Sequence, residues 1–159
     1  MVQDTNASAD DAAQGTAMRL AQTLVASLHL ADRASQSLGI EILDVAPGRV
    51  RIAMSVRQDM VNGHGICHGG FIFAFADSAF AFACNSHGDP MVAAGASIEF
   101  LVPALRGERV IATAEEVSRG ARHGIYDVTV ASAAGQVFAL FRGRCSRLRG
   151  TTQSASTGT

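Results

Sequence analysis

The stretch FIFAFADSAFAFAC, residues 71–84, decides the fold of this chain, because it is a long apolar run interrupted only by Asp77 and Ser78. The run is rich in Ala and Phe, contains no Gly or Pro, and would form about four helical turns. A helix that is apolar on every side is a buried helix, since no face of it is suited to water. The stretch therefore predicts a buried central helix, which the rest of the chain must enclose.

Asp77 is the candidate functional residue of this helix. Burying an unpaired carboxylate costs several kcal/mol or forces its protonation, and acids perturbed in this way concentrate at working sites. The alternative interpretation is structural, with the carboxylate held by Ser78 or by backbone N–H groups. We favour the functional interpretation, because a chain that tolerates the cost of this burial has a use for the group.

A segment rich in glycine and histidine, NGHGICHGG at residues 62–70, stands directly before the helix. The first amides of a helix have no partner within it and lie at the positive end of its dipole, and glycines let a ligand approach them. Such a helix start binds an anion, or an oxygen that becomes one during a reaction. The rival interpretation is a dinucleotide-binding fingerprint, but Gly63, Gly65 and Gly69 miss its spacing by one residue.

The same segment holds His64, Cys67 and His68, which are residue types that bind metals. Ordered metal sites usually need three or four ligands and no fourth is evident, so we expect no metal or other cofactor. We expect the histidines to organise the loop by hydrogen-bonding its backbone. Cys67 beside His68 would be a nucleophile only with a base and a lowered pKa, and a lone cysteine is weak support for that role.

The spacing of Gly69 and Asp77 predicts a second copy of the chain. Asp77 follows Gly69 by eight residues, which is about 12 Å along a helix axis. One substrate carbonyl cannot contact both groups of the same helix, because each contact requires about 3 Å. If both groups act on one substrate, Asp77 comes from a second, antiparallel helix related by a two-fold axis. The spacing thus predicts a symmetric dimer with two composite sites.

The rest of the chain predicts one further helix and a sheet. Residues 16–37 carry Leu20, Leu24, Leu28 and Ala31 roughly on one helical face, and Gly39 is the expected stop. Alternating apolar and polar residues predict strands over 40–45, 49–57, 91–101, 110–117, 125–131 and 137–147. The connections between the last four strands are too short for helical crossovers, so we expect these four to form an antiparallel meander.

Together these elements predict an α+β fold in which a curved antiparallel sheet wraps the central helix. The chain has 159 residues, 48% of them hydrophobic, which suits one domain with a substantial core. We expect this domain over residues 16–149, between small, polar and disordered tails at 1–15 and 150–159.

Charge and cysteine usage indicate the compartment and exclude some partners. The net charge of −1 gives no sign of a nucleic-acid partner. Cys67, Cys84 and Cys145 are an odd, scattered set that is typical of reduced thiols. No basic region followed by an apolar core marks a signal peptide, and the run at 71–84 is too short to span a bilayer. We therefore expect a soluble, cytoplasmic protein with no membrane partner.

Residues 62–86, NGHGICHGGFIFAFADSAFAFACNS, resemble the PaaI branch of the hot-dog-fold acyl-CoA thioesterases, the thioesterases of phenylacetate degradation. The segments IEFLVPALRGE, GIYDVTV and FALFRG are similar to the same family, so the resemblance covers roughly residues 16–149. It implies the hot-dog fold, in which a curved antiparallel sheet of five to six strands grips one long helix. It also implies side-by-side homodimers, often paired into homotetramers, in agreement with the dimer predicted from the spacing.

The resemblance implies a role for each of four residues. Asp77 matches the catalytic acid, which acts as nucleophile or general base across the dimer interface, and Gly69 matches the residue whose N–H polarises the thioester carbonyl. His68 and Asn62 match residues that shape the pocket beside it. The implied substrates are phenylacetyl-CoA and its ring-hydroxylated derivatives.

Further residues are expected to contact the substrate. Gly70 and Ser78 flank the proposed catalytic groups, and Ser78 stands where Thr is common in this branch. Arg119 and Arg122 share one turn, where they would meet the phosphates of CoA. The alternative for these arginines is an ordinary solvated strand end.

Two other functions compete with thioester hydrolysis. A hot-dog hydratase or dehydratase of acyl thioesters would recruit His68 together with Asp77. A non-enzymatic acyl-CoA-binding regulator would need a fused DNA-binding segment, and residues 1–40 show neither such a module nor a basic patch.

Overall fold

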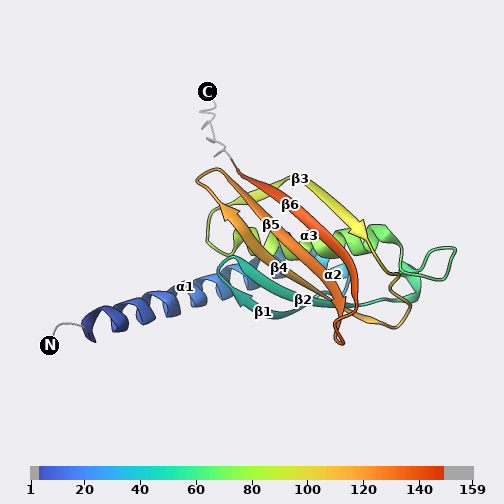
Figure 1. Ribbon diagram of the computed structural model, residues 1–159, viewed down its shortest axis with the longest axis horizontal. Coiled ribbons are helices and arrows are strands. Elements are labelled where there is room, and N and C mark those ends of the chain that lie inside the picture. The colour runs from blue at the N-terminus through green and yellow to red at the C-terminus, as the bar shows by residue number, and fades with distance from the viewer. Residues whose placement is uncertain (1–3, 149–159) are drawn as a thin grey trace, which may run out of the picture.

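The computed structural model describes residues 4–148 as one curved sheet wrapped around a long helix, with a second long helix projecting from the body (Figure 1). The helices are α1 (Asp4–Ala31), α2 (Arg33–Ser37) and α3 (Gly69–Asn85), with a short 3-10 turn at Gln58–Met60. The strands are β1 (Glu41–Ala46), β2 (Arg49–Ser55), β3 (Met91–Phe100), β4 (Arg109–Arg119), β5 (His123–Ser132) and β6 (Val137–Arg147).

The six strands form one antiparallel sheet in the order β1-β2-β4-β5-β6-β3. The predicted architecture, a helix wrapped by an antiparallel sheet of five to six strands, is confirmed. The predicted meander of the last four strands is wrong for one of them, because β3 pairs with β6 at the sheet edge and β4 pairs with β2. The reason is α3, which intervenes between β2 and β3 and delivers the chain to the far edge of the sheet.

The central helix is the predicted apolar run, and its sheet-facing side forms the core. Phe75, Ala76, Ala79 and Phe80 are fully buried. The ring of Phe80 packs against Tyr126 and Phe141, with centroids 5.8 and 5.9 Å away. The backbone of β6 lies against this ring at Gly143, where a Cβ would lie only 2.8 Å from Phe80. Glycine is therefore needed where the strand crosses the helix.

The predicted helix over 16–37 is two helices. Asp32 interrupts it, because its carboxylate accepts hydrogen bonds from the N–H groups of Ala34 and Ser35, at 3.0 and 3.2 Å, and so caps α2. Gly39 follows with a φ of +70°, as expected for a helix stop. At the other end, α1 begins at Asp4, so residues 4–15, expected in a tail, continue the helix. The C-terminal tail expected at 150–159 lies outside the described residues.

The buried face of α1 also differs from the predicted one. Ala21 and Val25 are fully buried, whereas Leu20 and Leu28 are 49% and 38% exposed. The small side chains face the body of the protein, and the larger leucines point toward solvent. Within residues 4–148, no helix combines the length and the hydropathy needed to cross a bilayer.

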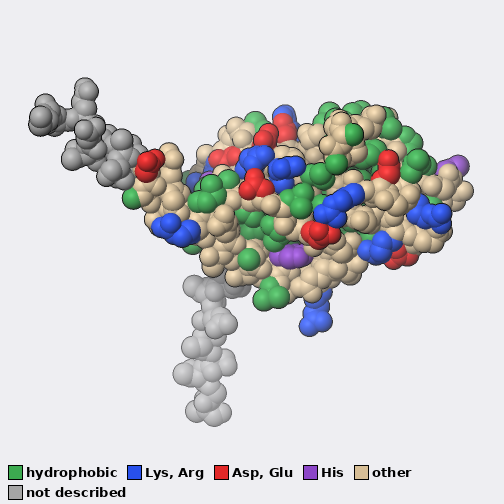
Figure 2. Space-filling model, turned by 90° about the horizontal axis from the view of Figure 1, so that it is seen from below, with side chains coloured by type: hydrophobic (Ala, Val, Ile, Leu, Met, Phe, Trp, Pro, Cys, Tyr) green, Lys and Arg blue, Asp and Glu red, His purple; other side chains and the backbone are tan. Residues whose placement is uncertain are grey.

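The surface carries mixed charge. In Figure 2, basic and acidic side chains lie next to one another on the face seen from below. Ion pairs join strands of the sheet: Arg109 on β4 reaches across β2 to Glu41 on β1 at 2.8 Å, and Arg142 on β6 pairs with Asp127 on the neighbouring β5 at 2.6 Å.

Candidate functional site

The start of α3 is fixed by its own N-cap and by two flanking segments. His68 is the N-cap, and its Nδ1 accepts a hydrogen bond from the N–H of Gly70 at 2.9 Å. The backbone N–H of His68 donates to Met60 O, and that of Cys67 donates to Ala104 O, both at 2.8 Å. These bonds hold the helix start between the segment after β2 and the connection between β3 and β4.

Asn62 organises the turn that leads into the helix. Its side-chain Oδ1 accepts from the N–H of His64 at 2.9 Å, and its backbone carbonyl accepts from Gly65 at 3.0 Å. Gly65 has a φ of +78°, a conformation that favours glycine. The turn closes where the N–H of Asn62 donates to Ile66 O at 2.9 Å. The histidines were expected to organise this loop; His68 does so through the helix cap, while the turn itself depends on Asn62.

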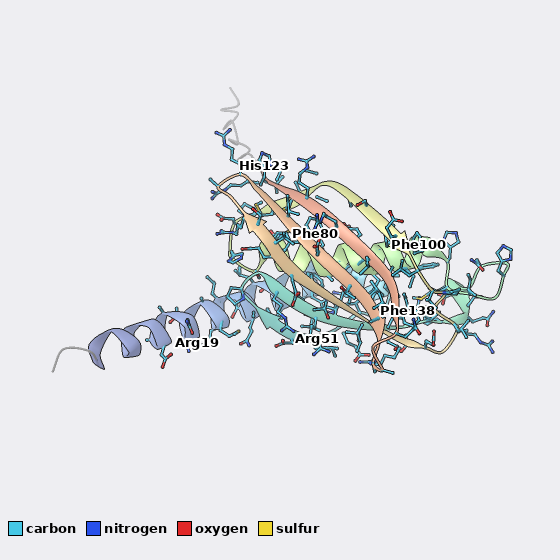
Figure 3. The ribbon with its side chains drawn as sticks, viewed as in Figure 1. Arg19, Arg51, Phe80, Phe100, His123 and Phe138 are labelled. Carbon is cyan, nitrogen blue, oxygen red and sulfur yellow. The ribbon has the colours of Figure 1, made fainter. Side chains whose placement is uncertain are left out.

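The amide of Gly69 opens into a hollow. As the first residue of α3, Gly69 makes no N–H hydrogen bond to any residue the structure describes. The hollow has a volume of about 370 Å³, and we call it the Gly69 hollow. Its walls include Asn62, Ile72, Phe100 and Phe138. The two phenylalanines lie together at the end of the sheet beside the start of α3 (Figure 3).

Gly69 is also where a side chain would obstruct this hollow. A Cβ placed there would lie 3.0 Å from the Phe100 ring, which is 55% exposed and covers the glycine. The glycine thus brings an unpaired N–H within reach of a ligand while an aromatic ring lies over it.

Asp77 lies on the side of α3 that neither the sheet nor α1 covers fully. It is half-buried, and its carboxyl group has no side-chain hydrogen-bond or ion-pair partner within residues 11–148. Burial raises the pKa of its carboxyl group above the usual value for aspartate. The hydroxyl of Ser78 donates to Ala74 O at 2.9 Å, so it does not hold the carboxylate. The form of the structural interpretation in which Ser78 holds the carboxylate is therefore wrong.

Within one chain, Gly69 and Asp77 stay apart. Both belong to α3, a regular helix, and the eight residues between them correspond to about 12 Å along the axis. A single chain therefore presents two half-sites, an amide at one point of the helix and a carboxylate at another.

A second hollow lies on the other side of the helix start, between α2 and α3. It has a volume of about 450 Å³, and its walls include Leu38, His68, Gly70 and Phe71. The N–H of Gly70 is occupied by the His68 side chain, so Gly70 contributes backbone surface rather than a free donor. Sequence reasoning missed the part played by α2 here, because its lining residues Ala34 and Ser37 carry no chemical signal.

Arg119 and Arg122 lie far from the Gly69 hollow of their own chain. Arg119 pairs with Asp89 at 2.6 Å, and Arg147 contacts the other oxygen of the same carboxylate at 2.8 Å. The backbone carbonyl of Arg122 accepts from the N–H of Arg147 at 2.9 Å. This group surrounds the turn before β5, whereas Phe100 marks the opposite end of the sheet (Figure 3).

Cys67 lacks the properties of a nucleophile. Its thiol is buried, and burial raises its pKa, so the thiol stays protonated near neutral pH. Among residues 4–148, His, Cys, Asp and Glu side chains form no group of three or more able to hold a metal ion.

Comparison with known proteins relates these features to one family. The thioesterase superfamily model matches residues 64–139, which include the helix start, α3 and most of the sheet. Acyl-coenzyme A thioesterase PaaI of Escherichia coli K12 is 41% identical over 120 residues, covering 76% of this chain and 86% of that protein. Human acyl-coenzyme A thioesterase 13 is 32% identical over 83 residues, covering 51% of this chain and 59% of that protein.

Solved structures agree with these sequence matches. The PaaI protein of E. coli, from the phenylacetic acid degradation operon, superposes with a TM-score of 0.82 at 37% identity, covering 84% of this chain and 97% of that one. The TT0310 protein of Thermus thermophilus superposes with a TM-score of 0.71 at 44% identity, covering 74% of this chain and 98% of that one. The fold, the helix start and the extent of these matches together establish that this chain belongs to the thioesterase superfamily and has its hot-dog fold.

Proposed function

We propose that this chain is an acyl-CoA thioesterase that hydrolyses aryl-acetyl-CoA thioesters, such as phenylacetyl-CoA and hydroxyphenylacetyl-CoA, to the free acid and CoA. The observation that carries the proposal is the carboxylate of Asp77, which is half-buried and unpaired among the described residues, on an apolar helix whose first amide, at Gly69, is also unpaired among them. An unpaired donor and an unpaired base are the two groups that thioester hydrolysis requires. The 41% identity to an acyl-CoA thioesterase supports the same reaction.

The active unit that we infer is a homodimer in which each site takes Gly69 from one protomer and Asp77 from the other. The edge strand β3 supports this arrangement, because most of its residues are exposed, Val92 and Phe100 by 43% and 55%. β3 contains neither Pro nor Lys, the residues that commonly protect a free edge. Antiparallel pairing of β3 with its symmetry mate would extend the sheet and place two α3 helices side by side.

In this composite site, the N–H of Gly69 donates to the thioester carbonyl oxygen and stabilises the negative charge that develops there. The partner's Asp77 either attacks the carbonyl carbon or removes a proton from an attacking water. A new C–O bond forms, the C–S bond breaks, and the CoA sulfur leaves as a thiolate that takes up a proton. If Asp77 attacks, water then hydrolyses the resulting anhydride.

The remaining site residues act around these two groups. Asn62 and His68 hold the helix start so that the Gly69 amide points into its hollow. Gly70 and Ser78 provide surface beside the acyl group, and the hollows on either side of the helix start are of a size suited to small ligands.

Assembly and location follow from the same proposal. By resemblance to the PaaI branch, we infer that two dimers pair into a homotetramer. A cytoplasmic location fits the CoA substrate and the three free, buried cysteines. Native mass measurement tests the assembly.

The decisive experiment measures thiol release from a panel of acyl-CoA esters by the purified full chain, with Asp77→Asn as the matched control. We expect turnover of phenylacetyl-CoA and its hydroxylated forms, and at least about a hundredfold lower kcat in the variant. Release of no thiol from any ester would reject the proposal. If the chain instead hydrated an enoyl-CoA ester or dehydrated a hydroxyacyl-CoA ester, the competing hydratase or dehydratase function would be established.

A further inference from the structure

The side chain of Asn85, the last residue of α3, holds the first residue of β3. Its Nδ2 donates to Met91 O at 3.0 Å, and its Oδ1 accepts from the N–H of Met91 at 2.9 Å. The same Nδ2 donates to Ala81 O, one turn back in α3, at 2.9 Å. One amide group therefore joins α3 to the edge strand and bonds both backbone groups of Met91, as a neighbouring strand would.

The bonds of Asn85 lie on the free edge of β3. In an antiparallel ladder the N–H and C=O of one residue point to the same side, and those of the next residue point to the opposite side. The N–H of Leu148, which follows β6, donates to Pro90 O at 2.9 Å, so the carbonyl of Pro90 points toward β6. The backbone groups of the next residue, Met91, therefore point away from β6. Asn85 thus occupies the first position of the edge along which a partner's β3 would pair.

The place of this tether matters because β3 runs alongside α3, from the end of the helix back to its start (Figure 1). Met91 is held at the end of α3 by Asn85, and the Phe100 ring covers Gly69 at its start. In the dimer inferred above, two copies of β3 pair antiparallel, so the Met91 end of one strand lies beside the Phe100 end of the other. The tether of one chain therefore borders the Gly69 hollow of its partner.

Helix geometry assigns each tether to one of the two composite sites. Asn85 follows Asp77 by eight residues and Gly69 by sixteen, which correspond to about 12 and 24 Å along the axis of α3. In the proposed dimer, Asp77 of one chain meets Gly69 of the other. Each Asn85 thus lies about 12 Å from the site that receives the Asp77 of its own chain, and about 24 Å from the other site.

We propose that Asn85 is a positioning residue of the composite site. By fixing the pairing edge of β3 to the end of α3, it sets where the Asp77 carboxylate lies relative to the partner's Gly69. This assignment rests on the thioesterase function and the dimer proposed above, and adds the residue that links the pairing edge to the helix. Asn85 acts only through the placement of Asp77. A displacement of about 1 Å at a reacting group can lower a rate about a hundredfold, so loosening the tether should reduce kcat.

Ser86 provides a matched control at the same end of the helix. Its Oγ accepts from the N–H of Gly48 and donates to Ala83 O, both at 2.7 Å, and the residue is buried. Gly48 lies in the turn between β1 and β2, and β1 is the sheet edge opposite β3. Ser86 therefore ties α3 to the sheet by a side-chain hydrogen bond, as Asn85 does, but away from the edge where the partner would pair.

The first test compares Asn85→Ala with Ser86→Ala in steady-state hydrolysis of phenylacetyl-CoA, with dimers confirmed by native mass measurement. Both variants should have a lower Tm, because each loses side-chain hydrogen bonds. Only Asn85→Ala should lower kcat, by at least about tenfold, with KM within about twofold of wild type. Asn85→Asp keeps the acceptor for the Met91 N–H and replaces the alanine variant if that one forms no dimers. It should also lower kcat, because it no longer donates to Met91 O.

The second test asks whether the tether acts on one site or on the whole dimer. In a mixed dimer of an Asp77→Asn chain and a Gly69→Pro chain, the one intact site takes Asp77 from the Gly69→Pro chain. Adding the Asn85 substitution to the Gly69→Pro chain should therefore lower kcat, again by at least about tenfold. Adding it to the Asp77→Asn chain should leave kcat near that of the unmodified mixed dimer, because that tether lies about 24 Å from the intact site.

Each outcome of these tests has one meaning. Wild-type kcat in the Asn85 variants, or an equal loss in Ser86→Ala, would overturn the assignment. Equal losses from both placements in the mixed dimer would show that Asn85 only stabilises the fold or the dimer, which would overturn it as well. A wild-type protein that releases no thiol would reject the proposed function and this inference with it, so the two failures are distinguishable.

Discussion

The side chain of His68 caps α3 through the N–H of Gly70, 2.9 Å from Nδ1, and leaves the N–H of the intervening Gly69 unpaired among the described residues. The histidine thus fixes the helix start and at the same time leaves the neighbouring amide free to bind a ligand. This relationship makes the cap part of the site.

Replacing His68 with Ala should therefore weaken both stability and activity. We expect a loss of about 1 kcal/mol in the free energy of unfolding, the usual scale of a lost N-cap, together with a lower kcat/KM. His68→Asn retains a side-chain acceptor at the cap and should recover most of both quantities. Thermal unfolding and steady-state kinetics measure them. An alanine variant with a lowered Tm but wild-type kcat/KM would show that the His68 cap stabilises the fold without contributing to the reaction.

The ionisation of Asp77 should be visible in the acid limb of the rate profile. Asp77 must be ionised to act as base or nucleophile, and burial raises its pKa while the positive end of a partner helix would lower it. Because these effects oppose each other, wild-type activity should fall at acidic pH and not near neutrality. An acid limb near pH 7 would implicate a histidine instead, as histidine titrates there at about 6.5.

Asp77→Asn should also change the dependence of stability on pH. An acid whose folded-state pKa is raised stabilises the fold below its unfolded pKa of about 3.9, and this contribution is lost as pH rises through the folded pKa. The asparagine variant should therefore have a higher Tm than the wild type at neutral pH, with the difference shrinking as the pH approaches 4. A lower Tm for the variant at neutral pH, with the difference shrinking toward acidic pH, would mean that the ionised carboxylate is stabilised in the native assembly.

The composite site predicts that two inactive variants restore activity together. Asp77→Asn and Gly69→Pro should each be nearly inactive, since proline removes the N–H yet is tolerated at the first position of a helix. After joint refolding, about half the dimers are mixed and each has one intact site, so activity should recover to about a quarter of wild type per chain. Lack of recovery, with mixed dimers confirmed by mass and each variant shown to be folded, would refute the shared-site mechanism.

Gly143→Ala tests the crossing of β6 over the central helix. A Cβ there would lie 2.8 Å from the Phe80 ring, so we expect a loss of about 1–3 kcal/mol in stability, the usual scale of overpacking. Gly63→Ala is the control, because a Cβ at Gly63 has no atom within 4 Å. Combining Gly143→Ala with Phe80→Leu should cost less than the sum of the two single changes, as measured by denaturant unfolding.

Exhaustive chelation tests the expectation that His64, Cys67 and His68 bind no metal. Activity should be unchanged after chelation, because Nδ1 of His68 already accepts from Gly70 and the Cys67 thiol is buried and protonated. Loss of activity on chelation and recovery with Zn²⁺ would restore the metal interpretation. Slow modification of the native protein by a thiol reagent would check the burial of Cys67 independently.

Much of the fold was predictable because its strongest signals are local. The apolar run at 71–84 became α3 at Gly69–Asn85, and the six strands lie close to their predicted ranges. The break at Asp32 was missed, because apolar periodicity continues through it and only the side-chain cap reveals it. The place of β3 was missed because strand order depends on which edge of the sheet α3 reaches, and no local pattern encodes that path.

The candidate site was predictable in part, for a related reason. Asn62, His68 and Gly69 are close in sequence, and the structure keeps them together at the start of α3, with Asn62 and Gly69 lining one hollow and His68 the other. Phe100 and Phe138 come from β3 and β6, and as apolar residues they gave no sign of a role in the site. The distance between Asp77 and Gly69 could be predicted from the sequence, because an α-helix rises by a fixed length per residue.

The sharing of α3 between two sites has a consequence for gene dosage. When a cell makes both wild-type and Asp77-deficient chains, each proposed site needs Asp77 from only one protomer, so activity falls in proportion to the deficient fraction. A chain that lacks both Asp77 and Gly69 inactivates both sites of any dimer that contains it. Activity is then proportional to the square of the wild-type fraction. The position of two groups on one helix thus determines whether a damaged allele is neutral toward its partner or dominant over it.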